Sequence, residues 1–325
     1  MSRVLIASPL VSQTDDSHLI ARLRADGHEL GFRQDLVGKS EDAVIDAIAG
    51  VDGVVASTEP YTRRVIESNP RLRVLSRTGV GYDAIDLEAA SERRIAVCTT
   101  IGSNDRTVAD WAVLAMLALT RQLPQAIAGM QGGRWVRPME GRDFWGKTVG
   151  IIGLGAIGKH VARRVRGFEC QVLAYDVVRD ERFAAEAGVS YVDLDELVER
   201  SDFITIHTLL TPATRALIDK ARLRRMKPTA FLVNSSRGPV VDERAIARAL
   251  RERWIAGAAL DVFEAEPLAP DSPLRSLDSV ILSAHIAGIT EESTRRAVEM
   301  ACENVRRLLK GEPPLSIVNP AVLAG

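Results

Sequence analysis

Three glycines that follow a short apolar segment constrain the fold of this chain more than any other feature. Gly153, Gly155 and Gly158 form a G-x-G-x-x-G pattern directly after the apolar stretch 148–152, and a helical pattern over 159–166 follows. In a βαβ unit the first glycine permits a tight turn, the second lets the backbone approach a pyrophosphate, and the third lets the helix pack closely on the strand. The pattern therefore predicts a dinucleotide site, and a strand–helix turn without a ligand is the alternative.

Strand-like and helix-like segments alternate along the chain in two series. The first has apolar strand candidates at 4–7, 53–56, 74–75 and 96–98. After an apolar helix over roughly 107–121 and a loop marked by Gly132, Gly133 and Pro138, the second series begins. Its six strand candidates lie at 148–152, 171–175, 203–207, 230–235, 256–261 and 280–283. This alternation predicts an α/β protein with two doubly wound parallel-sheet domains, and a last helix over 291–310 that crosses back to the first domain.

Composition narrows the class of protein. At 325 residues the chain is long enough for two domains, each with its own core. The formal net charge of −1 leaves no positive excess for nucleic acid or an anionic membrane surface. The most apolar run, 111–119, is much shorter than the roughly 20 residues of a membrane helix. Three scattered cysteines and an N-terminus that reads as a strand, not as a signal peptide, predict a soluble cytoplasmic protein without nucleic-acid or membrane partners.

The cofactor preference depends on one acidic residue. Asp176 directly follows the strand candidate 171–175, near the spacing at which such folds place an acid beside the adenosine ribose. A carboxylate there accepts hydrogen bonds from the ribose hydroxyls and repels a 2′-phosphate. Asp176 therefore predicts NAD, and the nearby Arg179 keeps NADP as the alternative.

Polar residues follow several of the predicted strands, where a doubly wound sheet binds its ligands. Of the five histidines, His207 and His285 end apolar strands, and a hydrogen-bonded core histidine is the alternative for each. Arg237 follows another strand, where its guanidinium can bind a carboxylate bidentately. Asp261 and Glu266 follow a third. Neither an H-E-x-x-H metal motif nor a G-x-S-x-G nucleophile motif occurs, so no metal site is predicted.

Taken in order, these segments resemble the D-isomer-specific 2-hydroxyacid dehydrogenase family, in its phosphoglycerate-dehydrogenase-like branch. The resemblance runs along nearly the whole chain and is carried by 77–83, 153–158, 201–207, 234–238, 261–267 and 285–288. It implies a Rossmann NAD-binding domain over 102–289. A flavodoxin-like substrate domain would consist of 1–101 and 290–325. It also implies that the two domains close over the substrate, and that the chain is a homodimer whose interface includes the helix after residue 107.

The resemblance also implies roles for individual residues. Arg237, Glu266 and His285 would be the catalytic residues. His285 would protonate the carbonyl oxygen of a 2-keto acid while NADH delivers hydride to the carbonyl carbon, and Glu266 would pair with the imidazolium. Arg237 and the backbone N–H groups around Val80 and Gly81 would bind the substrate carboxylate. The positions implied around NAD are Gly153, Gly155, Ala156, Ile157, Gly158, Asp176, Thr208, Ser235, Ser236, Asp261 (beside the nicotinamide amide) and Gly288.

One departure from the family pattern bears on the substrate. Phosphoglycerate enzymes usually carry Arg-Ser after the strand that here ends at Ala56, whereas this chain reads Ser57-Thr58-Glu59. An acid is a poor neighbour for a phosphate, so we expect a smaller substrate such as hydroxypyruvate or glyoxylate, with D-3-phosphoglycerate as the alternative. Two further hypotheses stay open: an NADH-sensing interaction protein like the C-terminal-binding-protein corepressors, and a formate- or phosphite-type oxidant on the same fold.

Overall fold

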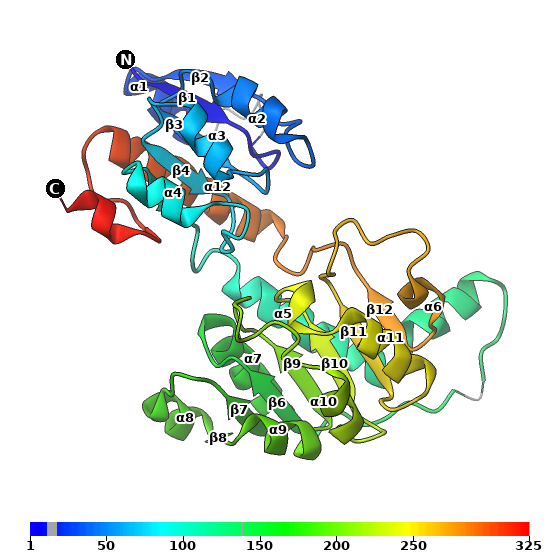
Figure 1. The fold of residues 1–325 in the computed structure, drawn as a ribbon. Coiled ribbons are helices and arrows are strands. Elements are labelled where there is room, and N and C mark those ends of the chain that lie inside the picture. Colours follow the sequence, from blue (N-terminus) through cyan, green and yellow to red (C-terminus); the bar gives the residue numbers. More distant parts are fainter. Residues whose placement is uncertain (12–17, 138, 325) are drawn as a thin grey trace. The chain divides into compact units, whose positions relative to one another are not determined.

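The computed structural model describes residues 1–11, 18–137 and 139–324, and the chain forms two compact units (Figure 1). The first unit comprises Met1–Asn104 and Ile289–Gly325, and the second comprises Asp105–Gly288. The first unit ends three residues later than the predicted Ile101, because the N–H of Ser103 donates to Thr100 and Arg296 donates to the Ser103 carbonyl, which holds this segment within the unit. The C-terminal segment of the unit likewise begins at Ile289 rather than at Thr290.

Within the described residues, the first unit contains a five-stranded parallel sheet. Its strands are β1 (Arg3–Ile6), β2 (Glu29–Phe32), β3 (Gly53–Ala56), β4 (Val74–Arg77) and β5 (Ala96–Cys98). They are arranged in the order β2-β1-β3-β4-β5. This is the strand order of flavodoxin-like folds, so the expected fold of this unit is confirmed.

Helices cover both faces of this sheet. On one face lie α2 (Glu41–Ile48), α3 (Arg63–Ser68) and α4 (Leu87–Glu92), and on the other lie α1 (His18–Ala25) and α12 (Glu291–Leu309). A capping box between Thr290 and Ser293 begins α12. From α12, Ala301, Cys302 and Val305 pack against apolar side chains of β1, β3 and β4. The C-terminal helix therefore completes the core of a unit whose sheet is built from the first hundred residues.

In its described part, the second unit contains a seven-stranded parallel sheet. The strands are β6 (Thr148–Ile152), β7 (Gln171–Tyr175), β8 (Val189–Tyr191), β9 (Phe203–Ile206), β10 (Phe231–Asn234), β11 (Gly257–Leu260) and β12 (Val280–Leu282). Their order is β12-β11-β10-β9-β6-β7-β8. Counted from the start of the unit this is the Rossmann order 3-2-1-4-5-6, with one further strand at the edge, so the predicted nucleotide-binding fold is confirmed.

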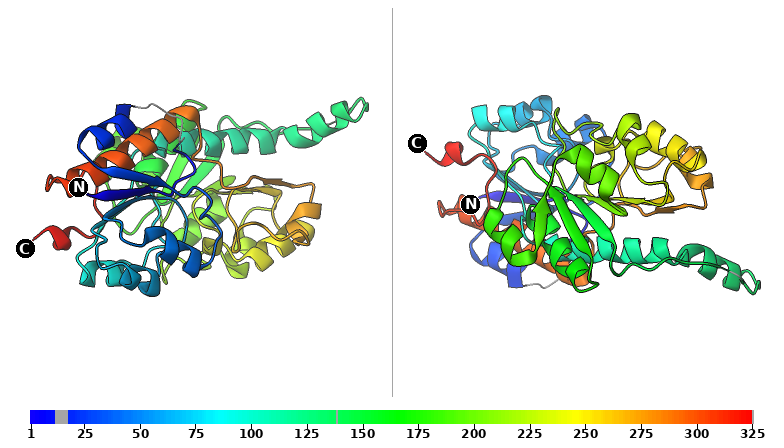
Figure 2. Two further views of the ribbon diagram at one scale, coloured as in Figure 1. Left: turned by 90° about the horizontal axis from the view of Figure 1, so that it is seen from above. Right: turned by 90° about the horizontal axis from the view of Figure 1, so that it is seen from below.

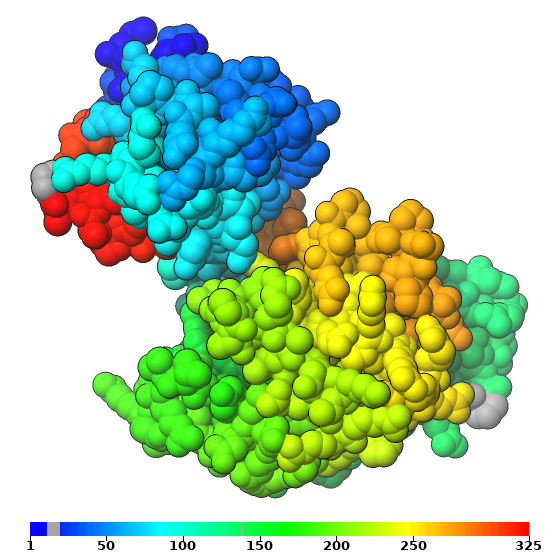
Figure 3. Space-filling view, viewed as in Figure 1, coloured from blue at the N-terminus to red at the C-terminus, as the bar shows by residue number. Residues whose placement is uncertain are grey.

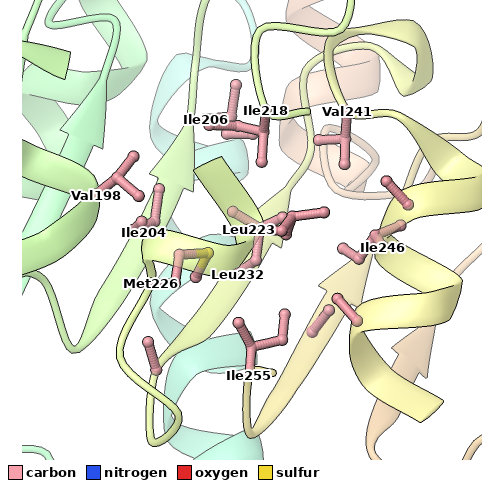
Figure 4. Close-up of a cluster of buried hydrophobic side chains, with 14 of the residues drawn as sticks. Val198, Ile204, Ile206, Ile218, Leu223, Met226, Leu232, Val241, Ile246 and Ile255 are labelled. Carbon is pink, nitrogen blue, oxygen red and sulfur yellow. The ribbon is translucent and has the colours of Figure 1, made fainter. Parts of the chain in front are cut away.

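Two apolar cores lie on the two faces of the second sheet. One face is covered by α5 (Asp105–Thr120), α7 (Ala156–Arg166) and α8 (Glu181–Ala187), and the other by α9 (Leu194–Arg200), α10 (Lys220–Arg225) and α11 (Glu243–Arg251). Figure 4 shows the second of these cores, in which Ile204 and Leu232 of the sheet meet Leu223 and Ile246 of the helices. Because both faces are buried, the central strands are mostly apolar, which made them recognisable in the sequence.

The prediction of six strands in the second series was wrong by one, and the first series also lacked a strand. Both of the missed strands, β2 and β8, lie at the edge of their sheets. The residues of β2 alternate between exposed and half-buried, and Ser190 in the middle of β8 is exposed. An edge strand buries too little surface to require an apolar run, so neither produced the signal on which the prediction depended.

One helix of the second unit projects away from its sheet. After α5 the chain turns at Gln122, which has a left-handed backbone, into α6 (Leu123–Gln131). Figures 2 and 3 show the blue-green α6 segment extending from the edge of this unit. Its apolar side chains Leu123, Ile127 and Met130 are 42%, 47% and 52% exposed. Pro138, which the sequence placed in the following loop, lies outside the described residues.

Candidate active site

The glycine turn between β6 and α7 has the close contacts that its pattern predicts. Gly153 has φ of +93°, and a Cβ there would lie 2.7 Å from the carbonyl carbon and oxygen of His207. A Cβ at Gly158 would overlap the carbonyl oxygen of Gly153. At Gly155, by contrast, a Cβ would meet no atom within 4 Å. Two glycines are therefore required by packing, whereas the third leaves open space above the turn.

The open space at Gly155 adjoins a helix N-terminus. Gly155 is the N-cap of α7 and provides no side-chain hydrogen bond to the first turn, which begins with Ala156 and Ile157. The N–H groups of that turn and the positive end of the helix dipole therefore face this space, as a pyrophosphate requires. The hydroxyl of Ser235, after β10, is buried and has no partner among the described residues. These features fit a bound dinucleotide.

Asp176 lies beside the glycine turn, at the carboxyl end of β7. Its Oδ2 accepts the N–H of Leu154 at 2.7 Å, and its Oδ1 accepts the N–H of Val178 at 3.0 Å. Arg179 does not pair with this carboxylate, because its guanidinium lies over the ring of Tyr191, 5.3 Å from the centroid. Each carboxylate oxygen keeps a lone pair for a further donor, so Asp176 fits the ribose hydroxyls of NAD.

A histidine–carboxylate pair follows β11 and β12. His285 Nδ1 lies 2.7 Å from Glu266 Oε2, and the two side chains are 45% and 37% exposed. Burial by itself would raise the pKa of Glu266. The hydrogen bond and charge of His285, the N–H of Phe263 (3.1 Å from Oε1) and the charge of Arg237 together hold that pKa below its usual value. The carboxylate is therefore ionised at neutral pH. Because Nδ1 of His285 pairs with Glu266, the other ring nitrogen, Nε2, is the one left for a substrate.

Asp261 holds the segment that carries His285. Its buried carboxylate accepts the hydroxyl of Ser283 at 2.5 Å, the N–H of Ile286 at 2.9 Å and the N–H of Ala287 at 2.8 Å. Its backbone carbonyl accepts the N–H of His285 at 2.8 Å. These bonds maintain a φ of +55° at His285, in the left-handed region that residues with a Cβ rarely adopt.

Arg237 is positioned by a residue that the sequence analysis did not single out. Asn234, 1% exposed at the end of β10, accepts the N–H and hydroxyl of Ser236 and donates from Nδ2 to the Arg237 carbonyl at 3.0 Å. A Cβ at Gly238 would overlap the backbone of Phe263, so the loop after β10 touches the loop after β11. The signal that could have found Asn234 is an amide residue at the end of an apolar strand, within the motif 234–238.

His207 directly follows β9 in the second unit, and its side chain is partly buried. Its Nε2 lies 2.8 Å from the hydroxyl of Thr205, and burial lowers its pKa to about 3. The imidazole is therefore neutral at physiological pH and is not paired with an acid in the described part of the chain. Of the two strand-end histidines, only His285 has a carboxylate partner. Thr208 follows at the same sheet edge, and Gly288 ends the second unit.

In the first unit, Glu59 differs from its expected placement. The side chain is fully buried, and its carboxylate accepts the N–H of Ser57 at 3.0 and 3.1 Å and the hydroxyl of Tyr61 at 2.9 Å. Two short-range donors thus hold it inside the unit, so the expectation that Glu59 faces a substrate phosphate was wrong. Val80 and Gly81 lie in the loop after β4, at the carboxyl edge of the same sheet.

Neither a metal-binding cluster nor a membrane-spanning helix occurs in the part of the chain that the structure describes. No three His, Cys, Asp or Glu side chains in the described ranges are grouped to hold a metal ion. No helix among them is both long and apolar enough to cross a membrane.

Comparison with known proteins identifies the family. The sequence model described as D-isomer specific 2-hydroxyacid dehydrogenase, NAD binding domain, matches residues 113–287. A glyoxylate reductase of Korarchaeum cryptofilum is 42% identical over 301 residues, covering 91% of each chain. A D-3-phosphoglycerate dehydrogenase of Methanocaldococcus jannaschii is 40% identical over 294 residues, covering 90% of this chain but 56% of that protein.

Solved structures support the same family. The chain superposes on a glyoxylate reductase from Paecilomyes thermophila with a TM-score of 0.88 at 27% identity, covering 98% of this chain and 99% of that one. A D-lactate dehydrogenase from Lactobacillus jensenii, solved with NAD+, gives a TM-score of 0.77 at 26% identity, with 97% and 99% covered. The chain belongs to the D-isomer specific 2-hydroxyacid dehydrogenase family and is an NAD-dependent oxidoreductase.

Proposed function

We propose that this enzyme reduces a small 2-keto acid, glyoxylate or hydroxypyruvate, to the D-2-hydroxy acid with NADH. The observation that carries the proposal is the 2.7 Å contact between His285 Nδ1 and Glu266 Oε2. An imidazole oriented by an ionised carboxylate is a suitable general acid for a carbonyl oxygen. The left-handed backbone of His285, held by Asp261, fixes the direction in which the ring presents its other nitrogen.

In the proposed reaction, bound NADH supplies a hydride to the carbonyl carbon. His285 donates its Nε2 proton to the carbonyl oxygen as negative charge develops there, so the product is a hydroxyl group. Glu266 stays ionised and stabilises the imidazolium before the transfer. In the reverse direction, neutral His285 accepts the hydroxyl proton.

The substrate carboxylate has two proposed binding groups. Arg237 lies at the edge of the second sheet, and its guanidinium is suited to a bidentate contact with a carboxylate. The N–H groups of Val80 and Gly81 would donate to the same anionic group. Asn234 would act through Arg237 by fixing its backbone.

The cofactor contacts are proposed from the glycine turn and from the strand ends around it. The pyrophosphate would bind at Gly155, Ala156 and Ile157, and the adenosine ribose at Asp176. Asp261 Oδ2 accepts one hydrogen bond, from Ala287, so a second lone pair is free to accept from the nicotinamide amide. The remaining proposed contacts are Gly153, Gly158, Thr208, Ser235, Ser236 and Gly288.

The choice of a small substrate rests on the relatives, since Glu59 no longer supports it. The glyoxylate reductase of Korarchaeum cryptofilum matches over 91% of its length, whereas the phosphoglycerate dehydrogenase matches over 56%. D-3-phosphoglycerate, as its oxidised form 3-phosphohydroxypyruvate, is the second candidate because a relative at 40% identity carries that name.

NADH oxidation across glyoxylate, hydroxypyruvate and 3-phosphohydroxypyruvate tests the proposal, with His285→Ala beside the wild type. We expect glyoxylate or hydroxypyruvate to have the highest kcat/KM, and turnover to fall by about 1,000-fold in the variant while NADH still binds. A higher kcat/KM for the phosphorylated substrate would reject the choice of substrate. Turnover that persists in His285→Ala would reject the assignment of the acid.

We also propose that the chain is a homodimer in the cytoplasm. Leu114 on α5 and Ile127 and Met130 on α6 are about half exposed, and apolar side chains grouped on adjoining helices are typical of an interface. The free, buried cysteines suit a reducing compartment. Light scattering would test the assembly: we expect twice the chain mass of 35.4 kDa, and the single-chain mass for Ile127→Glu but not for Leu323→Glu, an exposed site on the first unit.

A further inference from the structure

Arg77, the last residue of β4, ties together two loops at the carboxyl edge of the first sheet. Its Nε donates to the carbonyl of Ser57 at 2.8 Å, in the loop after β3. Its Nη1 donates to the carbonyl of Gly81, in the loop after β4. A single half-buried guanidinium thus fixes the separation of two segments that are neighbours only through the sheet.

The loop after β3 is held rigidly from its other side. The Glu59 carboxylate accepts the N–H of Ser57, and the hydroxyl of Tyr61 donates to the same carboxylate. Both Glu59 and Tyr61 are fully buried. Ser57 therefore donates to a buried carboxyl group and accepts from Arg77, so its position is set on both sides.

The loop after β4 is fixed at its start and left open at its tip. Thr78 donates its N–H to the Ala56 carbonyl at 2.9 Å, and its hydroxyl lies 2.7 Å from that of Ser8. The Gly79 carbonyl accepts the N–H of Thr100 at 3.0 Å. The N–H groups of Val80 and Gly81 donate to no residue that the structure describes.

Gly79 packs flat against the Arg77 side chain. A Cβ at Gly79 would lie 3.0 Å from Nη1 and 3.2 Å from Cζ of the guanidinium. The positive charge therefore lies directly behind the loop whose tip presents free N–H groups. This combination, consecutive free amides backed by a cation, is suited to an anion such as a carboxylate.

We propose that Arg77 is a positioning residue for the substrate: its guanidinium shapes the 79–81 loop so that the Val80 and Gly81 amides bind the carboxylate of the 2-keto acid. The proposal rests on the proposed function. Arginine suits the role because its planar fork reaches two carbonyls in different directions, whereas a lysine ammonium concentrates its donors at one point. Removing the guanidinium would loosen the loop without altering the acid–base pair or the cofactor turn, which lie in the other unit.

The test compares Arg77→Met and Arg77→Lys with Arg73→Met. Arg73 is exposed and directly precedes β4, so its variant removes the same charge next to the same strand. We measure KM for glyoxylate, kcat, and the Kd of NADH by fluorescence. Arg77→Met should raise KM by about 20-fold or more and Arg77→Lys by about 5-fold, with kcat and the NADH Kd within about 3-fold of wild type. Arg73→Met should leave all three unchanged.

Unchanged KM in Arg77→Met, or an equal loss of NADH affinity, would overturn the proposal. If Arg77→Met does not fold, Gly79→Ala replaces it. The added Cβ would lie 3.0 Å from Nη1, so the guanidinium must shift by a few tenths of an ångström at constant charge. KM should again rise, and a wild-type KM would overturn the role.

Failure of the proposed function can be distinguished from failure of the role proposed for Arg77. If the wild type turns over no 2-keto acid, that function is rejected. The loop is then tested with oxamate, an unreactive carboxylate probe, bound to the NADH complex. Weaker oxamate binding in Arg77→Met than in Arg73→Met would support the role of Arg77, and equal binding would overturn it.

Discussion

His285 Nδ1 lies 2.7 Å from Glu266 Oε2, although the two residues are 19 positions apart and follow different strands. The contact forms because β11 and β12 are parallel neighbours, so the segments that follow them leave the same edge of the sheet. Asp261, at the end of β11, reaches across to bind the backbone of Ile286 and Ala287. The acid–base pair is thus a product of strand adjacency and of one buried carboxylate.

Glu266→Gln should lower kcat for keto-acid reduction by about 10- to 100-fold, because glutamine keeps an acceptor but loses the charge that stabilises the imidazolium. The pKa of Glu266 is held below its usual value. The carboxylate is therefore still ionised at a pH equal to that usual value, and it is protonated only at lower pH. The defect should therefore persist from pH 9 down to pH 5. Steady-state kinetics over this range measure it, and NADH affinity serves as the internal control. A defect that disappears by pH 5 would contradict the assignment.

Two glycines of the turn should respond in opposite ways to alanine. Gly155→Ala adds a Cβ in open space, so the melting temperature should stay within about 2 °C of wild type while the NADH Kd rises by about 10-fold or more. Gly158→Ala places a Cβ on the Gly153 carbonyl, so the free energy of unfolding should fall by about 1–3 kcal/mol. Calorimetry and fluorescence titration measure both. Normal NADH binding by Gly155→Ala would mean that the pyrophosphate does not approach this turn.

Asp261→Asn should damage both stability and catalysis. The amide NH2 must face an N–H that the carboxylate now accepts, either that of Ile286 or that of Ala287, and a buried unsatisfied donor costs about 1–3 kcal/mol. With its loop released, His285 should lose alignment, and we expect kcat to fall by about 100-fold. Thermal unfolding and kinetics are compared with Asp271→Asn, an exposed control. A stable variant with full activity would show that Asp261 does not position the histidine.

Glu303 should give the first unit a pH-dependent stability. Its carboxylate accepts from Arg306 at 2.8 Å and from Arg307 at 2.8 Å, and its side chain is 15% exposed. The hydrogen bond from Arg306 lowers the pKa of Glu303, against the effect of burial, and with that from Arg307 brings it to about 2. A depressed pKa stabilises the fold fully above the unfolded value of 4.5, and this contribution is lost as the pH falls toward 2.

Glu303→Gln should therefore be less stable than wild type by about 1–2 kcal/mol at pH 7, allowing for solvent screening, and the difference should shrink below pH 4.5. Denaturant unfolding at pH 7, 4 and 3 measures this, with Glu299→Gln on the same helix as the control. A difference that is constant with pH would place the stabilisation in packing instead of charge.

The Rossmann turn and the central strands could be predicted because their requirements are local. Gly153 and Gly158 are needed where a strand turns sharply into a helix, and β9 and β10 are mostly apolar because both of their faces are buried. The edge strands β2 and β8 have no such requirement, and their pairing depends on a neighbour that is distant in sequence. They could not be recognised from their own residues.

The same contrast runs through the candidate site. The resemblance to the family, the cofactor turn and the residue types at each strand end could be recognised in the sequence. The folded structure was needed to show that Glu59 turns inward to Ser57 and Tyr61, that His207 is neutral and lies against the Thr205 hydroxyl, and that Arg77 bridges two loops. The chemical character of a side chain is known from the sequence. Its hydrogen-bond partners depend on strand order and packing, which bring together residues that no local pattern connects.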